Sequence, residues 1–207
     1  CDYQIRDITY NRDSSSFTID CPPPVGKNRK SKIENRKSPR VYLPLPGAGN
    51  VENAVAAWAV CNQFGLTTND FAEAVKTLQT VPMRAEVLQV GTLTVLNDCY
   101  NANPASTKNA LDILTNLDST GGRRLVFICG DMAELGQYAQ ALHADLGASI
   151  AQAKVRVLLA VGKFAKIAAE AAKKTAKYDL QTECFEDTPS ACNNLQKFVK
   201  DYDIILV

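Results

Sequence analysis

The second half of the sequence alternates short apolar segments with helical segments of ten or more residues, and this alternation constrains the fold more than any other feature. Three of the apolar segments are "RLVFICG" (124–130), "VRVLLAVG" (155–162) and "DIILV" (203–207). Near-continuous apolar strands are typical of a sheet that is buried on both faces. Strands separated by helices favour right-handed crossovers in a mostly parallel sheet. The sequence therefore predicts an α/β fold with helices flanking a mostly parallel sheet.

Capping residues set the boundaries of the helices between these strands. Asn103 is predicted to cap a helix at 104–117, because its side chain can accept a backbone N–H and Pro104 suits the first helical position. Thr188 is predicted to cap the last helix in the same way. The other elements predicted are two strands in 85–98 around a turn at Gly91, helices at 138–153, 163–174 and 189–200, and a short strand at 183–186.

The first part of the chain shows a different pattern, and we expect a domain boundary near residue 83, giving domains at 1–83 and 84–207. Short alternating runs in residues 1–20 predict a hairpin with its turn at 11–15, and a strand follows at 40–45. An apolar helix is predicted at 50–64 and a second at 67–78. Gly65 can end the first helix in a left-handed conformation, and Thr67 with Asp70 has the spacing of a capping box.

The charge distribution argues against nucleic acid or an anionic membrane as a partner of the whole chain. Its 207 residues include 23 basic and 22 acidic side chains, for a formal net charge of +1. The stretch 26–40 is locally basic, with seven Lys or Arg against one Glu. It can be interpreted as a phosphate-binding patch or as a solvated loop between two strands. The loop is favoured because no aromatic residues interleave with the charges.

Cysteine usage and the chain ends indicate a reduced, cytoplasmic protein that is part of a longer chain. The seven cysteines are an odd number without a CxxC pair, and the single histidine leaves no zinc-ligand spacing. No apolar stretch is long enough to span a bilayer. The sequence starts at Cys1 and ends in an apolar strand, and from this we expect a fragment.

The segment "LNDCYNANPAS" (96–106) places several short polar side chains at the end of a predicted strand, where ligands bind in parallel sheets. The carboxylate of Asp98 could accept two hydrogen bonds from a ribose diol, or it could bond its own turn backbone. Asn101 and Asn103 could contact a ligand or serve only as turn and cap residues. Tyr100 could stack on a base or cover the edge of the sheet.

A second polar loop, "CGDMAELG" (129–136), follows the next buried strand. Asp131 and Glu134 could hold an ammonium group or a metal ion, although capping carboxylates in a tight loop would look the same. His143, on the following helix, is interpreted as a packed or surface residue more readily than as a catalyst. Arg84, just after Pro82, could reach a phosphate or a ribose, or lie on the surface.

Several catalytic motifs are missing from the sequence. It contains no GxxxxGKT or GxxGKT phosphate loop and no GxGxxG loop. The single histidine argues against a Ser/His/Asp or Cys/His arrangement. We therefore expect no catalytic residue and no metal ligand in the chain itself.

The motifs together resemble those of the Mur ligases. The resemblance rests on "NDCYNANPASTKNALDIL" (97–114), "GDMAELG" (130–136) and "GNVENAVAA" (49–57), which follow one another in the family's order. It covers the chain from about residue 40 to its end and is strongest to the members that add D-alanyl-D-alanine to UDP-N-acetylmuramoyl-tripeptide in peptidoglycan synthesis. It implies that 84–207 is most of a C-terminal Rossmann-like domain, and that 1–83 is the last part of a central α/β ATPase domain.

The resemblance also implies an activity and its cofactors. Enzymes of this family use ATP to phosphorylate a carboxylate, and an amine then attacks the acyl phosphate. ATP and Mg²⁺ are the expected cofactors, with the Mg²⁺ ligands mainly outside this chain. Without the phosphate loop, the chain by itself is expected to be inactive and to bind ATP weakly or not at all.

Site residues are carried over by matching positions. Asn50 and Asn53 match the asparagines that hold adenine, although Gly49 stands where the family usually has a histidine, which puts the stacking on adenine in doubt. Arg84 and Asp98 match the residues that reach ribose and phosphate. The remaining positions are expected to line the cleft where acyl phosphate and dipeptide meet (Tyr100, which the nucleotide also contacts, Asn101 and Asn103) or to lie on the dipeptide side (Asp131, Glu134 and His143).

Three alternatives stay open. The chain could belong to another ligase of the superfamily, such as folylpolyglutamate synthetase or a different Mur ligase. It could be a non-catalytic α/β binding module derived from such a ligase. It could also bind nucleic acid through residues 27–40, although the neutral total charge argues against this. The expected partners are small molecules only, and a monomer is expected.

Overall fold

The computed structural model describes residues 4–20, 39–118 and 120–207. The chain divides into two compact units, Cys1–Gln79 and Thr80–Val207, and each is described here by itself. The boundary predicted near residue 83 falls just inside the second unit. Most of the basic stretch at 26–40 lies outside the described residues, so its interpretation as a loop stays a prediction.

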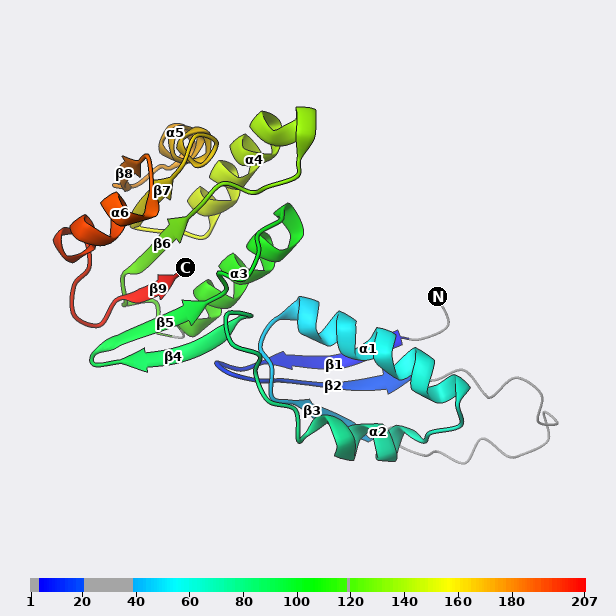
Figure 1. The fold of residues 1–207 in the computed structure, drawn as a ribbon. Helices are drawn as coiled ribbons and strands as arrows, with labels where there is room; N and C mark the ends of the chain where they lie inside the picture. The colour runs from blue at the N-terminus through cyan, green and yellow to red at the C-terminus, as the bar shows by residue number, and fades with distance from the viewer. Residues whose placement is uncertain (1–3, 21–38, 119) are drawn as a thin grey trace. The chain divides into compact units, whose positions relative to one another are not determined.

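The first unit is a three-stranded antiparallel sheet with two helices (Figure 1). The predicted hairpin is confirmed as β1 (Gln4–Tyr10) and β2 (Ser15–Asp20), and β2 also pairs with β3 (Arg40–Leu43). The helices are α1 (Ala48–Gln63) and α2 (Thr68–Val75). Alternate residues of β2 and β3 point into one core with residues of both helices, as the period of two along a strand requires (Phe17, Ile19, Val41, Leu43, Val51, Trp58 and Phe71).

Local capping explains where the two helices of this unit end and begin. Gly65, just after α1, has φ +85, in the left-handed region that glycine adopts without steric cost. The Thr67 side chain accepts the Asp70 backbone N–H, and the Asp70 carboxylate accepts the Thr67 N–H at 2.9 Å. The predicted capping box is therefore confirmed.

The second unit contains a six-stranded sheet in the order β4-β5-β9-β6-β7-β8. The hairpin of β4 (Glu86–Val90) and β5 (Leu93–Asn97) is antiparallel, and every other neighbouring pair is parallel. The mostly parallel α/β fold predicted from the sequence is confirmed. The other strands are β6 (Leu125–Cys129), β7 (Val157–Val161), β8 (Gln181–Phe185) and β9 (Ile204–Leu206). The last strand of the chain thus lies in the middle of the sheet.

Helices cover both faces of this sheet (Figure 1). One face packs against α3 (Pro104–Leu117), α4 (Ala139–Gln152) and α5 (Ala165–Thr175), and the other against α6 (Thr188–Asn194) and the following 3₁₀ turn (Leu195–Lys197). Along β6, Leu125 and Phe127 belong to the first core and Val126 to the second. Burial on both faces is the physical reason for the unbroken apolar runs of these strands.

The Asn103 cap predicted for α3 is confirmed. Two details of the last helix, α6, differ from the prediction. Asp187, not Thr188, caps α6, and its carboxylate accepts the Ser190 N–H at 2.8 Å. A carboxylate one residue upstream therefore displaces the threonine hydroxyl from this role. The α-helix also stops at Asn194 instead of reaching Lys200. The chain tightens into a 3₁₀ turn there, and Leu195 and Phe198 pack on the sheet.

No α-helix in the described part of the chain is both long and apolar enough to cross a membrane.

Candidate functional site

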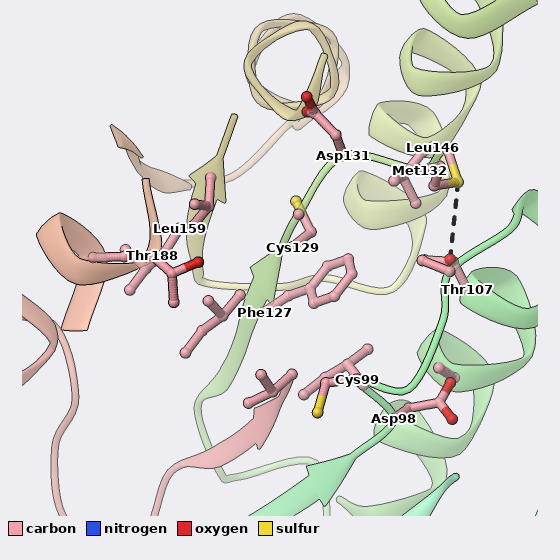
Figure 2. Close-up of a pocket in the computed structure, with 18 of the residues that line it drawn as sticks. Asp98, Cys99, Thr107, Phe127, Cys129, Asp131, Met132, Leu146, Leu159 and Thr188 are labelled. Atoms are coloured by element: carbon pink, nitrogen blue, oxygen red, sulfur yellow. Dashed lines mark hydrogen bonds between the residues drawn. The ribbon is translucent and has the colours of Figure 1, made fainter. Parts of the chain in front are cut away.

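A cavity of about 700 Å³ lies at the carboxyl ends of the parallel strands in the second unit (Figure 2). Its floor and walls are largely apolar, with Phe127, Leu159 and Leu206 from three neighbouring strands. The polar groups in its lining are few and come mainly from the two loops singled out in the sequence and from α6 (Asp98, Asn101, Thr107, Asp131 and Thr188). A largely apolar cavity with a few polar groups at this edge is the usual form of a ligand site in a parallel α/β sheet.

Arg84, Tyr100 and Asp98 come together beside this cavity. The Arg84 guanidinium lies over the Tyr100 ring, with 4.0 Å between its central carbon and the ring centroid. The residues on either side of Arg84 have left-handed backbones, with φ 63 at Met83 and φ 49 at Ala85. Each such residue costs about 1–2 kcal/mol, and strain of this kind is concentrated at functional sites. The Ala85 N–H that this conformation presents donates to Asp98 Oδ1 at 2.8 Å.

Asp98 is half-buried, and its pKa responds to that burial. Burial raises its pKa above the usual range, and the Ala85 N–H and the nearby Arg84 charge offset that rise only in part. No described residue donates a hydrogen bond to its Oδ2 oxygen. The carboxylate is therefore half-buried with one oxygen available to accept a hydrogen bond from a ligand hydroxyl.

The two asparagines after Asp98 hold the turn that leads into α3. Asn103 Oδ1 accepts the Ser106 N–H at 2.9 Å, and Ser106 Oγ accepts the Asn103 N–H at 3.1 Å. Asn101 Oδ1 accepts the Ala102 N–H at 2.8 Å. Asn101 also lines the cavity, whereas the Asn103 side chain caps the start of α3. Of the two, Asn101 is placed to present its amide to a ligand.

Asp131 lines the cavity, but the three hydrogen bonds of its carboxylate all go to the loop that begins α5. It accepts the backbone N–H groups of Lys163 at 3.1 Å, Phe164 at 2.8 Å and Ala165 at 2.6 Å. Gly162 makes this approach feasible, because a Cβ on it would lie 2.7 Å from the Asp131 carboxyl carbon. Asp131 thus ties the loop after β6 to the loop after β7 and sets the shape of this wall.

His143 is fully buried behind the same wall. Its Nε2 accepts the Met132 N–H at 3.0 Å, so the proton lies on Nδ1, which donates to the Ala139 carbonyl oxygen at 2.7 Å. The ring also stacks on Phe164, with 5.5 Å between centroids. Both ring nitrogens are therefore used inside the protein, in agreement with the packed interpretation of this histidine.

The other predicted positions lie outside the cavity lining. Glu134 is exposed with a left-handed backbone, φ 62, in the loop after β6. Asn50 and Asn53 belong to the first unit, near the start of α1, where their spacing of three residues places them on one helix face. Asn50 Nδ2 donates to the Pro46 carbonyl oxygen at 2.7 Å, and Asn53 is exposed.

Sequence reasoning missed several residues of the cavity wall. Thr107 is buried, and its hydroxyl lies 4.0 Å from the Met132 sulfur (Figure 2). Thr188 and Cys192 come from α6, which reaches the cavity only through the fold, so no local pattern could have indicated them. Three cysteines lie in this lining (Cys99, Cys129 and Cys192). Within the described ranges, no group of three His, Cys, Asp or Glu side chains could hold a metal ion.

Cys129 should be the least reactive of these thiols. Burial, with the charge of Asp131 as a smaller cause, raises the pKa of Cys129 to about 12. At equal exposure its thiolate would be about 1,000-fold scarcer than that of an ordinary cysteine near neutral pH. Pulsed alkylation with iodoacetamide, read by peptide mass spectrometry, should label the exposed Cys99 and Cys192 well before Cys129. Labelling of Cys129 as early as Cys192 would contradict this burial.

A mostly parallel α/β sheet with a half-buried acid and a largely apolar cavity at its carboxyl edge is the arrangement in which α/β domains commonly bind small ligands. Residues 83–207 match the family model described as "Mur ligase, glutamate ligase domain". The chain therefore belongs to the Mur ligase family, as the sequence motifs predict.

The relatives and solved structures that it resembles agree with this assignment. UDP-N-acetylmuramoyl-tripeptide–D-alanyl-D-alanine ligase of Bacillus subtilis is 33% identical over 179 residues, which is 86% of this chain and 35% of the relative. A crystal structure of MurF from Acinetobacter baumannii covers 99% of this chain and 41% of its own, with a TM-score of 0.74 and 27% identity. A structure of MurF ligase from Thermotoga maritima in complex with ADP has a TM-score of 0.71 at 20% identity, covers 99% of this chain and 42% of its own, and supports the fold alone. The chain thus spans about a third of the length of the Bacillus relative.

Proposed function

We propose that this chain is part of an ATP-dependent ligase that joins D-alanyl-D-alanine to UDP-N-acetylmuramoyl-tripeptide through an acyl phosphate in peptidoglycan synthesis. The observation that carries the proposal is the 33% identity to the Bacillus subtilis ligase over 86% of this chain. An alignment of 179 residues in a chain of 207 has to include both loops of the cavity wall, 96–106 and 129–136. The largely apolar cavity with a few polar groups supports the proposal.

Asp98, Arg84 and Tyr100 are the residues of the second unit that we assign to ATP. The available oxygen of Asp98 would accept a ribose hydroxyl, and the Arg84 guanidinium, held by the Tyr100 ring, would face a phosphate or the ribose. We assign Asn50 and Asn53, on α1, to adenine. ATP supplies the phosphoryl group that activates the tripeptide carboxylate. The part of this chain in the reaction is to bind and orient that nucleotide.

We assign the cavity itself to the incoming dipeptide and to the acyl phosphate. The methyl groups of D-alanyl-D-alanine suit the apolar lining, and Asn101 offers an amide at its rim. Asp131 and His143 would act by fixing the wall, since their hydrogen bonds are made within the protein. Asn103 would fix the start of α3, and Glu134 would contribute from the loop after β6.

The wider role of the chain follows from the same proposal. Residues 1–83 would be the last part of the central ATPase domain, and the phosphate loop and the main Mg²⁺ ligands would lie outside the chain. The described residues contain no group of three His, Cys, Asp or Glu side chains that could hold a metal ion. The chain by itself would be inactive, and the complete enzyme would work in the cytoplasm as a monomer.

Purifying the complete protein encoded by the gene and measuring product by mass spectrometry tests the proposal. We expect ATP consumption that requires both UDP-N-acetylmuramoyl-tripeptide and D-alanyl-D-alanine, with the joined pentapeptide as product. Turnover with glutamate and a folate in place of these substrates would support the folylpolyglutamate synthetase alternative instead. No turnover with any of them, together with a reading frame that lacks a phosphate loop, would support a binding module.

A further inference from the structure

A second cavity, of about 470 Å³, lies at the opposite end of the same sheet, where the parallel strands begin. Its charged lining residues come just before four neighbouring strands. Arg124 precedes β6 directly, Arg156 precedes β7, Asp179 comes shortly before β8, and Lys200 lies in the turn before β9. Because the strand order is β9-β6-β7-β8, the fold places these charges side by side along one sheet edge.

The lining of this cavity is strongly positive although the whole chain is nearly neutral. Four cations line it, with Arg123 as the fourth, against the single carboxylate of Asp179. Arg124 is neutralised by the buried Asp203, at 2.7 Å between Nη2 and Oδ2. Three cations and one anion are left, so the lining carries about two positive charges in a chain whose formal net charge is +1. The excess of positive charge is therefore confined to the lining of this cavity.

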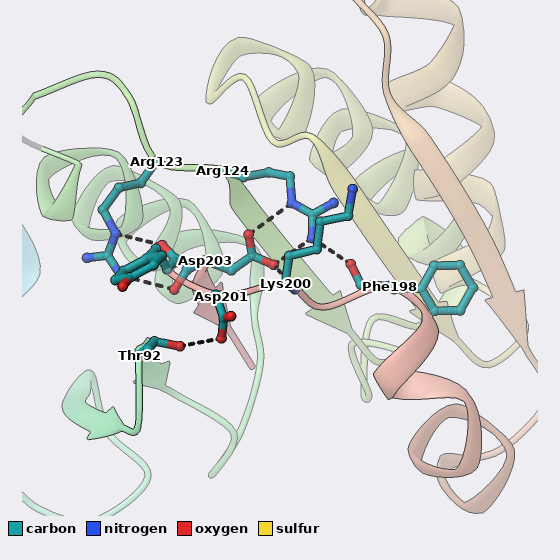
Figure 3. Close-up of polar contacts among 8 residues, drawn as sticks. Thr92, Arg123, Arg124, Phe198, Lys200, Asp201 and Asp203 are labelled. Atoms are coloured by element: carbon teal, nitrogen blue, oxygen red, sulfur yellow. Dashed lines mark hydrogen bonds and ion pairs between the residues drawn. The ribbon is translucent and has the colours of Figure 1, made fainter.

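The cations that remain are held mainly by neutral groups. Arg123 donates to the Tyr202 carbonyl oxygen at 2.7 Å and to the Asp203 carbonyl oxygen at 3.2 Å (Figure 3). The Arg156 guanidinium lies 5.0 Å from the centroid of the Tyr178 ring. No described carboxylate forms an ion pair with the Lys200 ammonium. Carbonyls and a ring orient a guanidinium without cancelling its charge, which leaves that charge for a ligand.

We propose that this cavity binds a small anion that carries two or more clustered phosphate or carboxylate groups. Guanidinium groups match the oxygens of phosphate and carboxylate in pairs, and an ammonium adds a point charge. The volume of about 470 Å³ is that of a small-molecule site, and the nearly neutral charge of the whole chain argues against a nucleic acid strand. None of its lining residues lines the cavity at the carboxyl edge, so the site is separate from the proposed nucleotide and dipeptide sites.

Isothermal titration of the whole 207-residue chain with inorganic pyrophosphate, and separately with citrate, tests the proposal. We expect saturable binding of at least one of the two, at one site, with Arg156→Gln and Lys200→Gln each weakening it about tenfold or more, or about 1.4 kcal/mol. Both side chains are exposed, so the variants should melt as the parent does. Lys173→Gln, an exposed change of the same charge on α5, should bind as the parent does.

The binding of the two anions to the parent chain and to the variants together tests the proposal. Binding of pyrophosphate alone would identify a phosphate site, and binding of both anions a general site for clustered anionic oxygens. Binding of neither at millimolar concentration would overturn the proposal. Equal weakening by Lys173→Gln would also overturn it, because the effect would then be nonspecific. Loss of binding in Arg84→Gln, with Arg156→Gln unaffected, would place the anion at the carboxyl edge and overturn the proposal as well.

Discussion

Replacing Gly162 with alanine should lower the free energy of unfolding of the second unit by about 3–5 kcal/mol, through backbone strain and overpacking together. Gly162 has φ +112, a conformation that residues with a Cβ rarely adopt. The added Cβ would also lie 2.7–2.8 Å from the three atoms of the Asp131 carboxyl group. Relieving the clash would move that carboxylate away from the N–H groups of residues 163–165. Urea unfolding followed by circular dichroism measures the change.

A matched change at Gly91 separates the two causes. Gly91 also has a positive φ, +58, but no atom lies within 4 Å of the position that an added Cβ would take. Gly91→Ala should therefore cost only the left-handed strain, about 1–2 kcal/mol. Equal losses for the two variants would show that the contact of Gly162 with Asp131 contributes nothing to stability.

Replacing Arg124 with methionine should be comparably destabilising, by about 3–5 kcal/mol, because it leaves a buried charge without its partner. Asp203 is 1% exposed, and Arg124 donates to its two carboxylate oxygens at 2.9 and 2.7 Å (Figure 3). Hydrogen bonding to Asp203 raises the pKa of Arg124, so the guanidinium is charged at any ordinary pH. Arg124 also donates to the Phe198 carbonyl oxygen at 2.7 Å, which ties the 3₁₀ turn to β6.

The double variant Arg124→Met/Asp203→Asn should recover much of this loss. Removing both charges leaves no buried charge without a partner. The asparagine oxygen can still accept the Lys200 N–H that Asp203 accepts at 2.8 Å. Thermal melts of the two single variants and the double give the coupling free energy directly. A double variant less stable than either single would contradict the interpretation of Arg124 and Asp203 as a compensated pair.

The helices and strands of the second unit were predictable because the sequence patterns that specify them are local. Apolar runs, the Asn103 cap with Pro104 and the turn at Gly91 act within a few residues, and each is found where the sequence predicts it. The order of strands was not predictable, since the insertion of β9 between β5 and β6 depends on contacts between segments far apart in sequence. The same holds for α6, which contributes Thr188 and Cys192 to the cavity.

The sequence predicted the edge of the sheet at which the cavity lies, but not the contacts that each of its residues makes. Polar residues after buried strands indicated the carboxyl edge, and Asp98, Asn101 and Asp131 all line the cavity found there. The sequence could not show which of the two carboxylates, Asp98 or Asp131, keeps an oxygen that a ligand could reach. Asp131 is used by three N–H groups of a loop some thirty residues away, whereas Asp98 keeps one oxygen without a donor among the described residues. That difference depends on backbone conformation at Gly162 and Ala85.

The raised pKa of Asp98 predicts how the stability of the fold responds when this carboxyl group is replaced. A carboxyl group whose pKa is raised by folding stabilises the fold fully below its unfolded pKa, and this contribution is lost as the pH rises through the raised folded value. The charged form of Asp98 therefore costs more free energy in the folded chain than in the unfolded chain. Asparagine at this position keeps an oxygen for the Ala85 N–H and removes the charge, so Asp98→Asn should melt at the same temperature as the parent or higher at pH 7. The gain should vanish in acid.

The most direct measurement is the KM for ATP of the complete ligase carrying Asp98→Asn, taken together with its melting temperature. In the proposed site the available carboxylate oxygen of Asp98 would accept a ribose hydroxyl, and asparagine would place an NH₂ group there. We therefore expect the KM to rise about 10- to 100-fold without loss of stability. Asp201→Asn, an exposed change whose carboxylate accepts the Thr92 hydroxyl, should leave the KM unchanged. An unchanged KM with a lower melting temperature for Asp98→Asn would make Asp98 a structural residue and contradict the proposed nucleotide site.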